Sequence, residues 1–576
     1  MARGKGMQRW GPLALASLVA VLLTWRMAPP PPCVQLAVTS SEEKSSLLVQ
    51  LSDEFERSRP MVGDRCIDVT VTRKPSGAAE QALARGWNEA IDGPRPDAWL
   101  PAASTWILLL DDQHPNLAHS DSPSLFRSPL VIGMPREMAI KLGWPDKDVG
   151  WADLLKLASN QTGWGTYGRP DWGAFRLGKT NPNISTSGLH ALIATYFAAS
   201  GKTRDLTTAT LAEPAVGDFV MGVEKPVVHY GDTVSNFLIN LQAADDEGRA
   251  LSYVSAVAME EKQIWDYNQG NPRGDPKDLG KHPPPTVPLV AIYPREGTLA
   301  ADHPYAVLSA PWVTAAKRMA AEAFLQFLER PEIQARFQAA GFRNQRDMPG
   351  PVIKEANGML PNRPGAYLVL PTGQVIGAIQ ASWNGLRKRA RVLIVIDRSA
   401  LSGDHDAKKL AQSVDDGLRQ LADDEVVGAW DIPNVAGAAQ PYLEMLPLQS
   451  LGPRRAELQS AIAGSRWSSD RPSLYRAVAV AVAKLKDGQD PSRINAVLVI
   501  GTGGRSPADA NNFKALADLS AVAGETPGIH VFTVAYGKSP DKNELQLMAK
   551  AGKGGYYDAS DPSSVARALI AVISNF

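Results

Sequence analysis

The sequence predicts an α/β fold in which a two-lobed domain is followed by a doubly wound, Rossmann-like domain. Strand-like and helix-like segments alternate along most of the 576 residues. Two short apolar runs, 130–134 and 287–293, are separated by about 150 residues that have helices and strands of their own. This pattern is typical of a chain that leaves one α/β lobe, builds a second lobe and returns. Further on, the run 390–396 is nearly all apolar, as a buried central strand of a second parallel sheet should be.

The first lobe is predicted from a β-α-β unit that begins at residue 34. Residues 34–38 alternate and are β-rich, and residues 39–44 then provide helix N-caps and acids for a first helical turn. The helix that follows has apolar residues at helical spacing: Leu47, Leu48, Leu51 and Phe55. Strand-like residues 67–71 complete the unit, and 97–100 form a further strand, so the sheet is predicted to be parallel.

The same alternation continues to the end of the chain. Helices are expected at 315–328 and 332–338, and the Pro- and Gly-rich residues 346–373 are expected to form a connector. Further strands are expected at 426–430, 496–500 and 529–535. We therefore divide the chain into residues 1–32 before the folded region, a first domain at 33–345 (lobe 1 at about 33–128 and 288–345, lobe 2 at about 129–287), a linker at 346–373 and a second domain at 374–576.

The N-terminus has the pattern of a membrane anchor or secretion signal. Arg3, Lys5 and Arg9 precede an almost uncharged segment at 10–25, which is shorter than the roughly 20 residues that span a bilayer comfortably. The segment lacks a small-x-small cleavage site, which favours an uncleaved anchor over a removed signal. A proline run at 29–32 follows as a spacer. Because positive charge precedes the segment, we expect a single-pass protein of the cell membrane with its bulk outside the cytoplasm.

The cysteine pattern agrees with an extracytoplasmic location. The chain has two cysteines, Cys33 and Cys66, and outside the cell such a pair most simply forms one disulfide. Closing this loop should contribute roughly 3–4 kcal/mol to stability. A lipid attached to Cys33 is the alternative, although prolines precede it where a lipoprotein signal has small residues.

Charge composition argues against nucleic acid as a partner. Sixty basic residues balance sixty acidic residues, and no basic run is longer than three residues. Phosphate backbones are bound by clustered Lys and Arg, so the sequence offers no electrostatic basis for such binding.

Residues 33–345 carry motifs of a known binding-protein family. The motif segments are 39–44, 96–101, 178–183, 185–188 and 293–298. In this order they resemble bacterial extracellular solute-binding proteins of the type 2 class over about 310 residues. The resemblance implies a periplasmic-binding-protein-like fold with a ligand cleft between its two lobes.

Residues 374–576 resemble a von Willebrand factor A domain. The segments that carry the resemblance are 395–399, 474–477, 498–504 and 531–537. The family's metal-ion-dependent adhesion site, if present, would hold Mg²⁺ with five side chains. Asp397 and Ser399 match that site, whereas the three other ligand positions are occupied by Leu401, Pro472 and Gly503. Mg²⁺ needs several oxygen ligands in near-octahedral geometry, so we expect no tight metal and no other cofactor, although a loop shift at Ser402 would restore one ligand.

Candidate ligand-binding residues follow from strand ends and helix starts, where ligands bind in open α/β folds. On lobe 1 these are Ser40 and Ser41; on lobe 2 they are Thr186, Ser187, Gly188, Tyr230, Asp232 and Thr233. Hydroxyls at helix N-termini bind anions, but ordinary helix capping explains each cluster equally well. The carboxylate of Asp232 would repel an anion, and it suits a cation, an amine, a polyol or a structural cap.

No catalytic motif is present. The chain contains no Gly-x-Ser-x-Gly elbow, no His-Glu-x-x-His and no zinc-ligand spacing. We therefore expect a binding protein and not an enzyme: the first domain would receive a small-molecule or cell-envelope ligand, and the second domain would dock an unidentified protein partner. A substrate receptor of a transport system and a cell-envelope hydrolase without a recognised motif are the alternatives.

Overall fold

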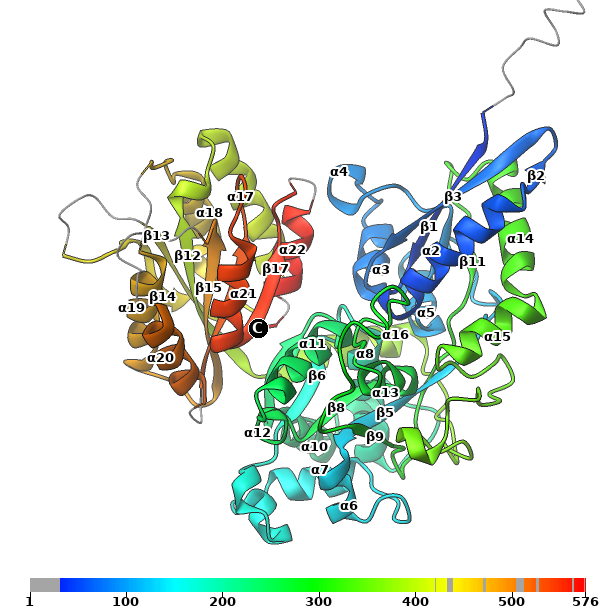
Figure 1. Cartoon of the computed structure of the whole chain (residues 1–576), viewed down its shortest axis with the longest axis horizontal. Helices are drawn as coiled ribbons and strands as arrows, with labels where there is room; N and C mark the ends of the chain where they lie inside the picture. The colour runs from blue at the N-terminus through cyan, green and yellow to red at the C-terminus, as the bar shows by residue number, and fades with distance from the viewer. Residues whose placement is uncertain are drawn as a thin grey trace, which may run out of the picture.

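The computed structural model describes residues 32–419, 421–432, 439–469, 473–503, 512–524, 528–561, 564–573 and 575–576. Figure 1 shows three α/β bodies. Lobe 1 and lobe 2 lie next to each other, and the C-terminal domain, coloured yellow to red, lies beside them with β17 and the C-terminus toward lobe 2. The predicted fold class is confirmed by the sheets described below.

Lobe 1 is built on a five-stranded sheet of order β11-β4-β1-β3-β2. Its strands are β1 (Val34–Ser40), β2 (Met61–Val62), β3 (Arg65–Arg73), β4 (Ala98–Leu100) and β11 (Ala306–Val307). Strand β1 is parallel to β3 and β4, which confirms the predicted β-α-β unit, while β2 and β11 pair antiparallel at the edges.

Helices cover this sheet on both faces. They are α2 (Glu42–Arg57), α3 (Ser76–Ala84), α4 (Glu89–Asp92), α5 (Ser104–Gln113), α14 (Ala315–Leu328) and α15 (Pro331–Ala339). Helix α2 buries the predicted apolar face, and its Phe55 ring lies 5.1 Å from that of Phe324 in α14. The returning segment of the chain therefore completes the core of lobe 1.

Lobe 2 has a six-stranded sheet of order β10-β5-β8-β6-β7, with β9 paired to β5. Its strands are β5 (Ser128–Pro135), β6 (Leu177–Thr180), β7 (Val227–Gly231), β8 (Ala256–Glu260), β9 (Leu289–Ile292) and β10 (Ala300–Ala301). The two runs predicted to cross between lobes are β5 and β9, and they pair antiparallel, with Ile132 opposite Ile292. Both strands lie within the lobe 2 sheet, however, and the chain returns to lobe 1 only after β10, so the prediction that 287–293 is the return crossing was wrong.

The helices of lobe 2 occupy the sequence between these strands. They are α6 (Arg136–Leu142), α7 (Trp151–Ala158), α8 (Thr186–Ser200), α9 (Thr208–Leu211), α10 (Pro214–Glu224), α11 (Val234–Asp246), α12 (Ala250–Tyr253) and α13 (Glu261–Asn268), with 3-10 turns η1 (Gly163–Tyr167) and η2 (Pro170–Trp172). Helix α8 is almost entirely buried, because it lies between the lobe 2 sheet and helices α10 and α16 (Gly373–Leu386).

The segment 346–373 contains one short 3-10 turn, η3 (Glu355–Asn357), and contributes the buried side chains of Met359 and Leu368. Helix α16, which begins where the second domain was predicted to begin, packs on α5 and α8 of the first domain. Its Trp383 ring meets Tyr230 edge-on at 5.1 Å. The boundaries at residues 345 and 373 stay predictions.

The C-terminal domain is doubly wound around a six-stranded sheet of order β14-β13-β12-β15-β16-β17. The strands are β12 (Arg389–Asp397), β13 (Val426–Ile432), β14 (Leu443–Ser450), β15 (Arg493–Gly501), β16 (Ile529–Ala535) and β17 (Lys553–Asp558). All neighbours are parallel except β13 and β14. Because the strand order reverses between β12 and β15, the loops after these two strands diverge and leave a crevice, the usual ligand position in such sheets.

The elements around this sheet are α17 (Asp404–Leu418), α18 (Arg455–Ala463), α19 (Leu474–Lys486), α20 (Asn512–Gly524), α21 (Lys542–Ala551) and α22 (Val565–Ile573), with the 3-10 turns η4 (Arg398–Ala400) and η5 (Gly452–Arg454). Helices α17 and α22 pack against each other on one face, and α19, α20 and α21 cover the other.

The predicted disulfide between Cys33 and Cys66 is confirmed, with 4.4 Å between the two Cα atoms. It ties the start of β1 to the start of β3, and these strands are already paired from Val34 and Ile67 onward. The predicted anchor at 10–25 lies outside the described residues. Among the helices that the structure describes, none is long and apolar enough to cross a membrane.

Candidate ligand cleft and domain junction

The two lobes face each other across a small cavity of about 30 Å³. Helix N-termini converge on it, from α2 and α3 of lobe 1 and from α8, α11 and α13 of lobe 2. Its polar lining consists of Ser41, Glu42, Glu43, Ser76, Ser185, Thr186, Ser187, Thr233, Ser235, Glu260 and Gln263. A space of this size holds about two water molecules. The cleft is therefore closed in this conformation.

Direct hydrogen bonds between the lobes hold the cleft closed. The indole Nε1 of Trp106 donates to Thr186 Oγ1 at 2.8 Å, and the Gly77 amide donates to the Ile184 carbonyl at 2.9 Å. Gly77 has no room for a side chain, because an added Cβ would lie 2.3 Å from the Asn183 carbonyl oxygen. The backbone of lobe 2 thus rests directly on the first turn of α3.

Four of the predicted ligand-binding residues meet in the cleft: Ser41, Thr186, Ser187 and Thr233. Ser41 and Thr233 occupy the N-cap positions of α2 and α11. The Thr233 hydroxyl accepts a hydrogen bond from the Asn236 amide, which is ordinary capping, whereas the Ser41 hydroxyl does not cap its own helix. Ser41 therefore keeps its hydroxyl for a side-chain network across the floor of the cleft.

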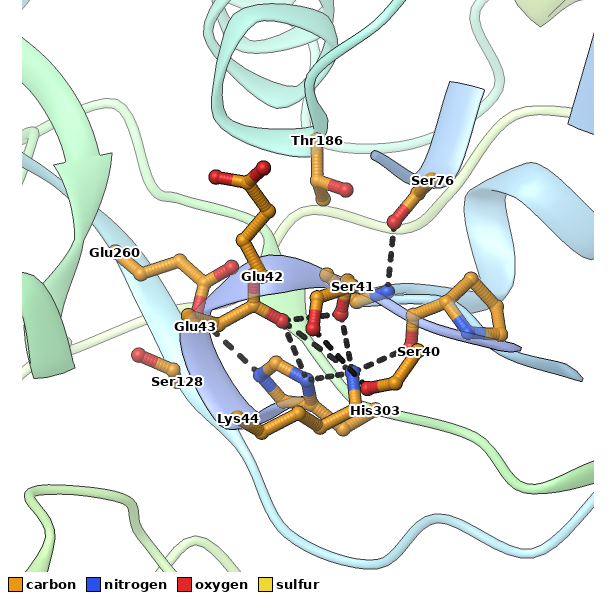
Figure 2. A network of polar contacts seen from close by, with 12 residues as sticks. Ser40, Ser41, Glu42, Glu43, Lys44, Ser76, Ser128, Thr186, Glu260 and His303 are labelled. Atoms are coloured by element: carbon orange, nitrogen blue, oxygen red, sulfur yellow. Dashed lines mark hydrogen bonds and ion pairs between the residues drawn. The ribbon is translucent and has the colours of Figure 1, made fainter. Parts of the chain in front are cut away.

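The centre of that network is the buried ammonium group of Lys44, shown in Figure 2. It donates to Ser41 Oγ, to the Pro101 carbonyl at 3.2 Å and to His303 Nδ1 at 3.1 Å, and it lies 3.3 Å from Glu43 Oε1. Since Lys44 donates to Nδ1, the proton of a neutral His303 ring lies on Nε2. That nitrogen faces Glu260 Oε2 of lobe 2 at 3.3 Å.

Burial shifts the ionisation of this network. Desolvation lowers the pKa of Lys44, although Glu43 and Glu260 oppose the shift. Desolvation, followed by the nearby Lys44 charge, lowers the pKa of His303 well below its usual range, so the ring is neutral near pH 7. Desolvation, followed by the Glu43 charge, raises the pKa of Glu260 well above its usual range.

Glu42 is a third carboxylate at the cleft, and Figure 2 shows it pointing away from the Lys44 network, toward the side of lobe 2. Burial is the main cause of its raised pKa, which Arg73 and a hydrogen bond with Thr233 partly offset. The Arg73 guanidinium lies 3.8 Å from the Glu42 carboxylate and is half exposed. The cleft therefore contains three carboxylates, Glu42, Glu43 and Glu260, whereas the described cations that lie within 4 Å of them are Arg73 and Lys44.

Glu43, Glu260 and His303 have the spacing of a metal site, since one ligand atom from each lies within 4.8 Å of the others. The donor set of two carboxylates and one imidazole suits several divalent ions. However, the Lys44 ammonium already lies 3.1 Å from His303 Nδ1 and supplies the positive charge there. We therefore interpret this group as an internal ion network between the lobes and not as a metal centre.

Three predicted residues do not line the cleft cavity. Ser40 is buried behind it and donates to the Ser41 carbonyl at 3.0 Å. Gly188 lets α8 approach β6, because a Cβ there would lie 2.2 Å from the Thr180 carbonyl oxygen. The hydroxyl of Tyr230 donates to Glu224 Oε2 at 2.6 Å inside lobe 2.

Asp232 also lies off the cavity, at the contact between lobe 2 and the C-terminal domain. Both of its oxygens accept from Asn236 Nδ2 at 3.0 Å, and the Tyr557 hydroxyl approaches Oδ1 at 3.5 Å. Asn575 donates to the same hydroxyl at 2.6 Å, and its carbonyl accepts from the Tyr230 amide at 3.2 Å. Burial, followed by the Glu42 charge, raises the pKa of Asp232 to about 7.

Sequence reasoning missed the carboxylates and the histidine of the cleft. Glu42 and Glu43 were interpreted as first-turn acids of a helix, which they also are. Glu260 and His303 are distant in sequence from α2, and nothing in their local pattern marks them. A weak signal existed for Glu260, because it ends a strand and begins a helix, as do the hydroxyl clusters that were identified.

The adhesion-site position of the C-terminal domain is centred on Asp397, whose carboxylate is already hydrogen-bonded within the domain. Asp397 is buried, and Ser399 and Thr502 donate to its two carboxylate oxygens, with hydroxyl distances of 2.6 and 2.9 Å. Leu401 is buried and apolar, and Gly503 packs on the carbonyl of Asp541, while Pro472 lies outside the described residues. The described residues therefore do not fit Mg²⁺, and its absence from the functional protein stays a prediction.

Comparisons with known proteins agree with the fold. A family model described as bacterial extracellular solute-binding protein matches residues 36–343, which is more than half of the chain. Two Mycobacterium tuberculosis proteins, Uncharacterized protein MT1884 (strain CDC 1551 / Oshkosh) and Uncharacterized protein Rv1836c (strain ATCC 25618 / H37Rv), are each 24% identical over 537 residues. The match covers 92% of this chain and 75% of each relative.

Three solved structures are similar to part of the chain. The periplasmic binding protein AfuA from Actinobacillus pleuropneumoniae is 16% identical, with a TM-score of 0.38, over 62% of this chain and 99% of its own. Maltose-bound MalE3 of T. maritima is 11% identical, with a TM-score of 0.39, over 62% and 94%. A von Willebrand factor type A protein from Catenulispora acidiphila is 17% identical, with a TM-score of 0.25, over 33% and 42%.

Proposed function

Because the chain belongs to the bacterial extracellular solute-binding protein family, we propose that it is a membrane-tethered extracytoplasmic binding protein whose inter-lobe cleft takes a small polar ligand that carries positive charge. Membership in this family indicates ligand binding and not catalysis. The positive charge that we propose for the ligand is inferred from the residues that line the cleft.

A positively charged ligand is supported by three carboxylates, Glu42, Glu43 and Glu260, which line the cavity together with hydroxyls from both lobes. The described residues of the lining include no Lys or Arg, and the buried ammonium group of Lys44 lies beneath it, bonded to Ser41. Such a surface repels anions. Hydroxyls from Ser41 and Thr186 complement it, because they accept hydrogen bonds from an ammonium group or exchange them with a polyol.

Ligand entry requires the lobes to separate, because the closed cavity is too small for anything beyond water or a single ion. The start of β5 and the end of β10 are the natural hinge, because Ser128 pairs with Ala301 there and the chain enters lobe 2 at β5 and returns toward β11 of lobe 1 after β10. Opening breaks the Trp106–Thr186 hydrogen bond and exposes Glu42 and Glu260 to solvent. An incoming cation then replaces water around the carboxylates as the lobes close.

Calorimetry on the full-length protein tests this proposal, with putrescine and choline as cationic probes and sulfate as the anionic comparison. We expect saturable binding of a cation that tightens as pH rises, because binding favours the ionised carboxylates whose pKa values burial raises. Glu42→Gln should weaken binding about ten-fold or more, whereas Glu322→Gln, an exposed glutamate on α14, is the matched control. Saturable sulfate binding in the cleft without cation binding would contradict the proposal.

We also propose that the C-terminal domain docks a protein partner at the carboxyl-end edge of its parallel strands, where the loop after β12 lies; we call this surface the crest. Trp467 is 56% exposed, and the neighbouring Ser468 amide donates to the Arg398 carbonyl in the turn that follows Asp397. Exposed tryptophans of this kind are frequent anchors of protein interfaces. The crest therefore offers an apolar anchor beside polar groups of the β12 loop without needing a metal ion.

A further inference from the structure

A cavity of about 420 Å³ lies at the junction of lobe 2 and the C-terminal domain, well apart from the ligand cleft. Lobe 2 contributes residues 174–176, 225–227 and 252–253 to its wall. The C-terminal domain contributes residues from 491–495 and from the β16 and β17 region, and Lys388 comes from the connection between the two parts. Volumes of this order are typical of small-molecule sites.

The described residues that line this cavity include five Lys or Arg side chains and no Asp or Glu. The cations are Arg176, Lys225, Lys388, Arg493 and Lys553. Arg493 is compensated, since it lies 3.2 Å from Asp490. For the other four, no carboxylate lies within 4.0 Å in the part of the chain that the structure describes. The Lys388 ammonium group donates to the Val227 carbonyl at 3.1 Å.

The positive groups come from different elements and repel one another. Desolvation lowers the pKa of Arg176, and desolvation followed by the Lys225 charge lowers that of Lys388. Desolvation, then Arg249 and Arg176, lowers the pKa of Lys553, and Glu247 opposes this shift only in part. Partly buried cations without counter-ions are costly, because the folded protein neither hydrates nor pairs them fully.

The rest of the wall is apolar or aromatic, from Phe175, Val227, Tyr253 and Ile494. A second cavity of about 320 Å³ lies at the same domain junction and shares Tyr253 and Lys553 with the first. Its other lining cations are Arg249, Arg273 and Lys550. Glu247 partly balances this second cavity, since it pairs with Arg249 and lies 3.0 Å from Lys550. The uncompensated charge is therefore concentrated in the first cavity.

We propose that this cavity is a second binding site, for a small molecule that carries a phosphate or diphosphate group, and that the bound anion contacts lobe 2 and the C-terminal domain at once. Four cations that have no close carboxylate among the described residues match the multiple charges of phosphate better than the single charge of a carboxylate, and Arg176 offers a planar guanidinium for phosphate oxygens. The apolar wall would hold the uncharged body of the ligand. Because Arg176 belongs to lobe 2 and Lys553 to the C-terminal domain, binding would strengthen the domain junction.

Calorimetric titration of the full-length protein with inorganic pyrophosphate at constant ionic strength tests the proposal. We expect saturable binding, and Arg176→Gln, Lys388→Gln and Lys553→Gln should each raise the Kd about ten-fold or more. Lys156→Gln is the matched control, since Lys156 is an exposed lysine of lobe 2 far from the cavity in sequence, on α7. Because the three cavity variants remove repulsion between like charges, their melting temperatures without pyrophosphate should equal or exceed that of the unaltered protein.

Absence of saturable pyrophosphate binding, or an equal loss of affinity in Lys156→Gln, would overturn the proposal. Competition then distinguishes two sources of the same chemistry. Displacement of pyrophosphate by phosphatidic acid vesicles but not by phosphatidylcholine vesicles would indicate a lipid headgroup, and displacement by glucose 6-phosphate alone would indicate a soluble phosphorylated compound. The acidic cleft between the lobes should not bind pyrophosphate, so the outcome is independent of the cation proposed there.

Discussion

Asp232→Asn provides a sharp test of the domain junction, because the substitution keeps the shape of the side chain and removes its charge. Asp232 is 5% exposed and lies between Asn236 of lobe 2 and Tyr557 of the C-terminal domain. Its neighbouring ionisable groups are Glu42, whose charge raises the pKa further, and the Tyr557 hydroxyl. Comparing the stability of the variant with that of the unaltered protein therefore measures how much the buried carboxyl group of Asp232 destabilises the fold.

The expected magnitude follows from the pKa of Asp232, which rises from 3.8 to about 7 on folding, chiefly because of burial. Between these values the folded protein binds one more proton than the unfolded chain, so stability falls as pH rises from about 4 to about 7. A shift of about three units corresponds to about 4 kcal/mol, which is the upper limit of the effect. At or below pH 4 Asp232→Asn should change stability little. At pH 5 the unfolded carboxyl is already ionised and the folded one is not, so the variant should be more stable by about 1.5 kcal/mol, and at pH 8 by up to about 4 kcal/mol.

Urea denaturation of the full-length protein, followed by tryptophan fluorescence, measures this effect. The midpoint of the variant minus that of the unaltered protein is determined at pH 5 and at pH 8, and the two differences are compared. Other buried carboxyls also titrate in this range, for example Glu80, with a pKa of about 7, and they cancel in the comparison. Asp218→Asn is the control, since Asp218 is an exposed aspartate of α10 and its loss changes net charge equally. Equal midpoint shifts for both variants at pH 8 would refute the assignment of Asp232 as a buried junction residue.

Three further outcomes are expected. Calorimetric titration of the full-length protein with Mg²⁺ should show no saturable isotherm below about 1 mM, because Asp397 is already bonded to Ser399 and Thr502; an isotherm that Asp397→Ala abolishes would show that the metal site is functional. Protease added to cells whose outer layers have been opened should digest residues 33–576, and full protection would exclude the proposed topology. A photo-crosslinking residue in place of Trp467 should capture a protein partner in cells, and capture that is equally efficient from the distant exposed position of Lys484 would argue against the crest as the docking surface.

The sequence by itself determined the fold class and most of the elements. Strand and helix periodicity are local properties, so β1, α2, α14 and β12 were found close to their observed bounds. The disulfide between Cys33 and Cys66 was also predictable, because no other cysteine competes for either partner. The two apolar runs 150 residues apart were correctly predicted as strands, but their pairing as β5 and β9 inside lobe 2, and the return to lobe 1 only after β10, were visible only in the structure.

Tertiary structure alone decided which residues share a site. Capping residues and strand ends are recognisable locally, so the sequence could single out Ser41 and Thr186, and the structure brings both to the cavity between the lobes. Glu260 and His303 join them only because β8 and the segment after β10 return to the same place, which no local pattern encodes. Asp232 follows the same sequence pattern as Ser41, yet its carboxylate faces Tyr557. A sequence pattern predicts that a side chain ends a strand; what it faces depends on the packing of elements that are hundreds of residues away.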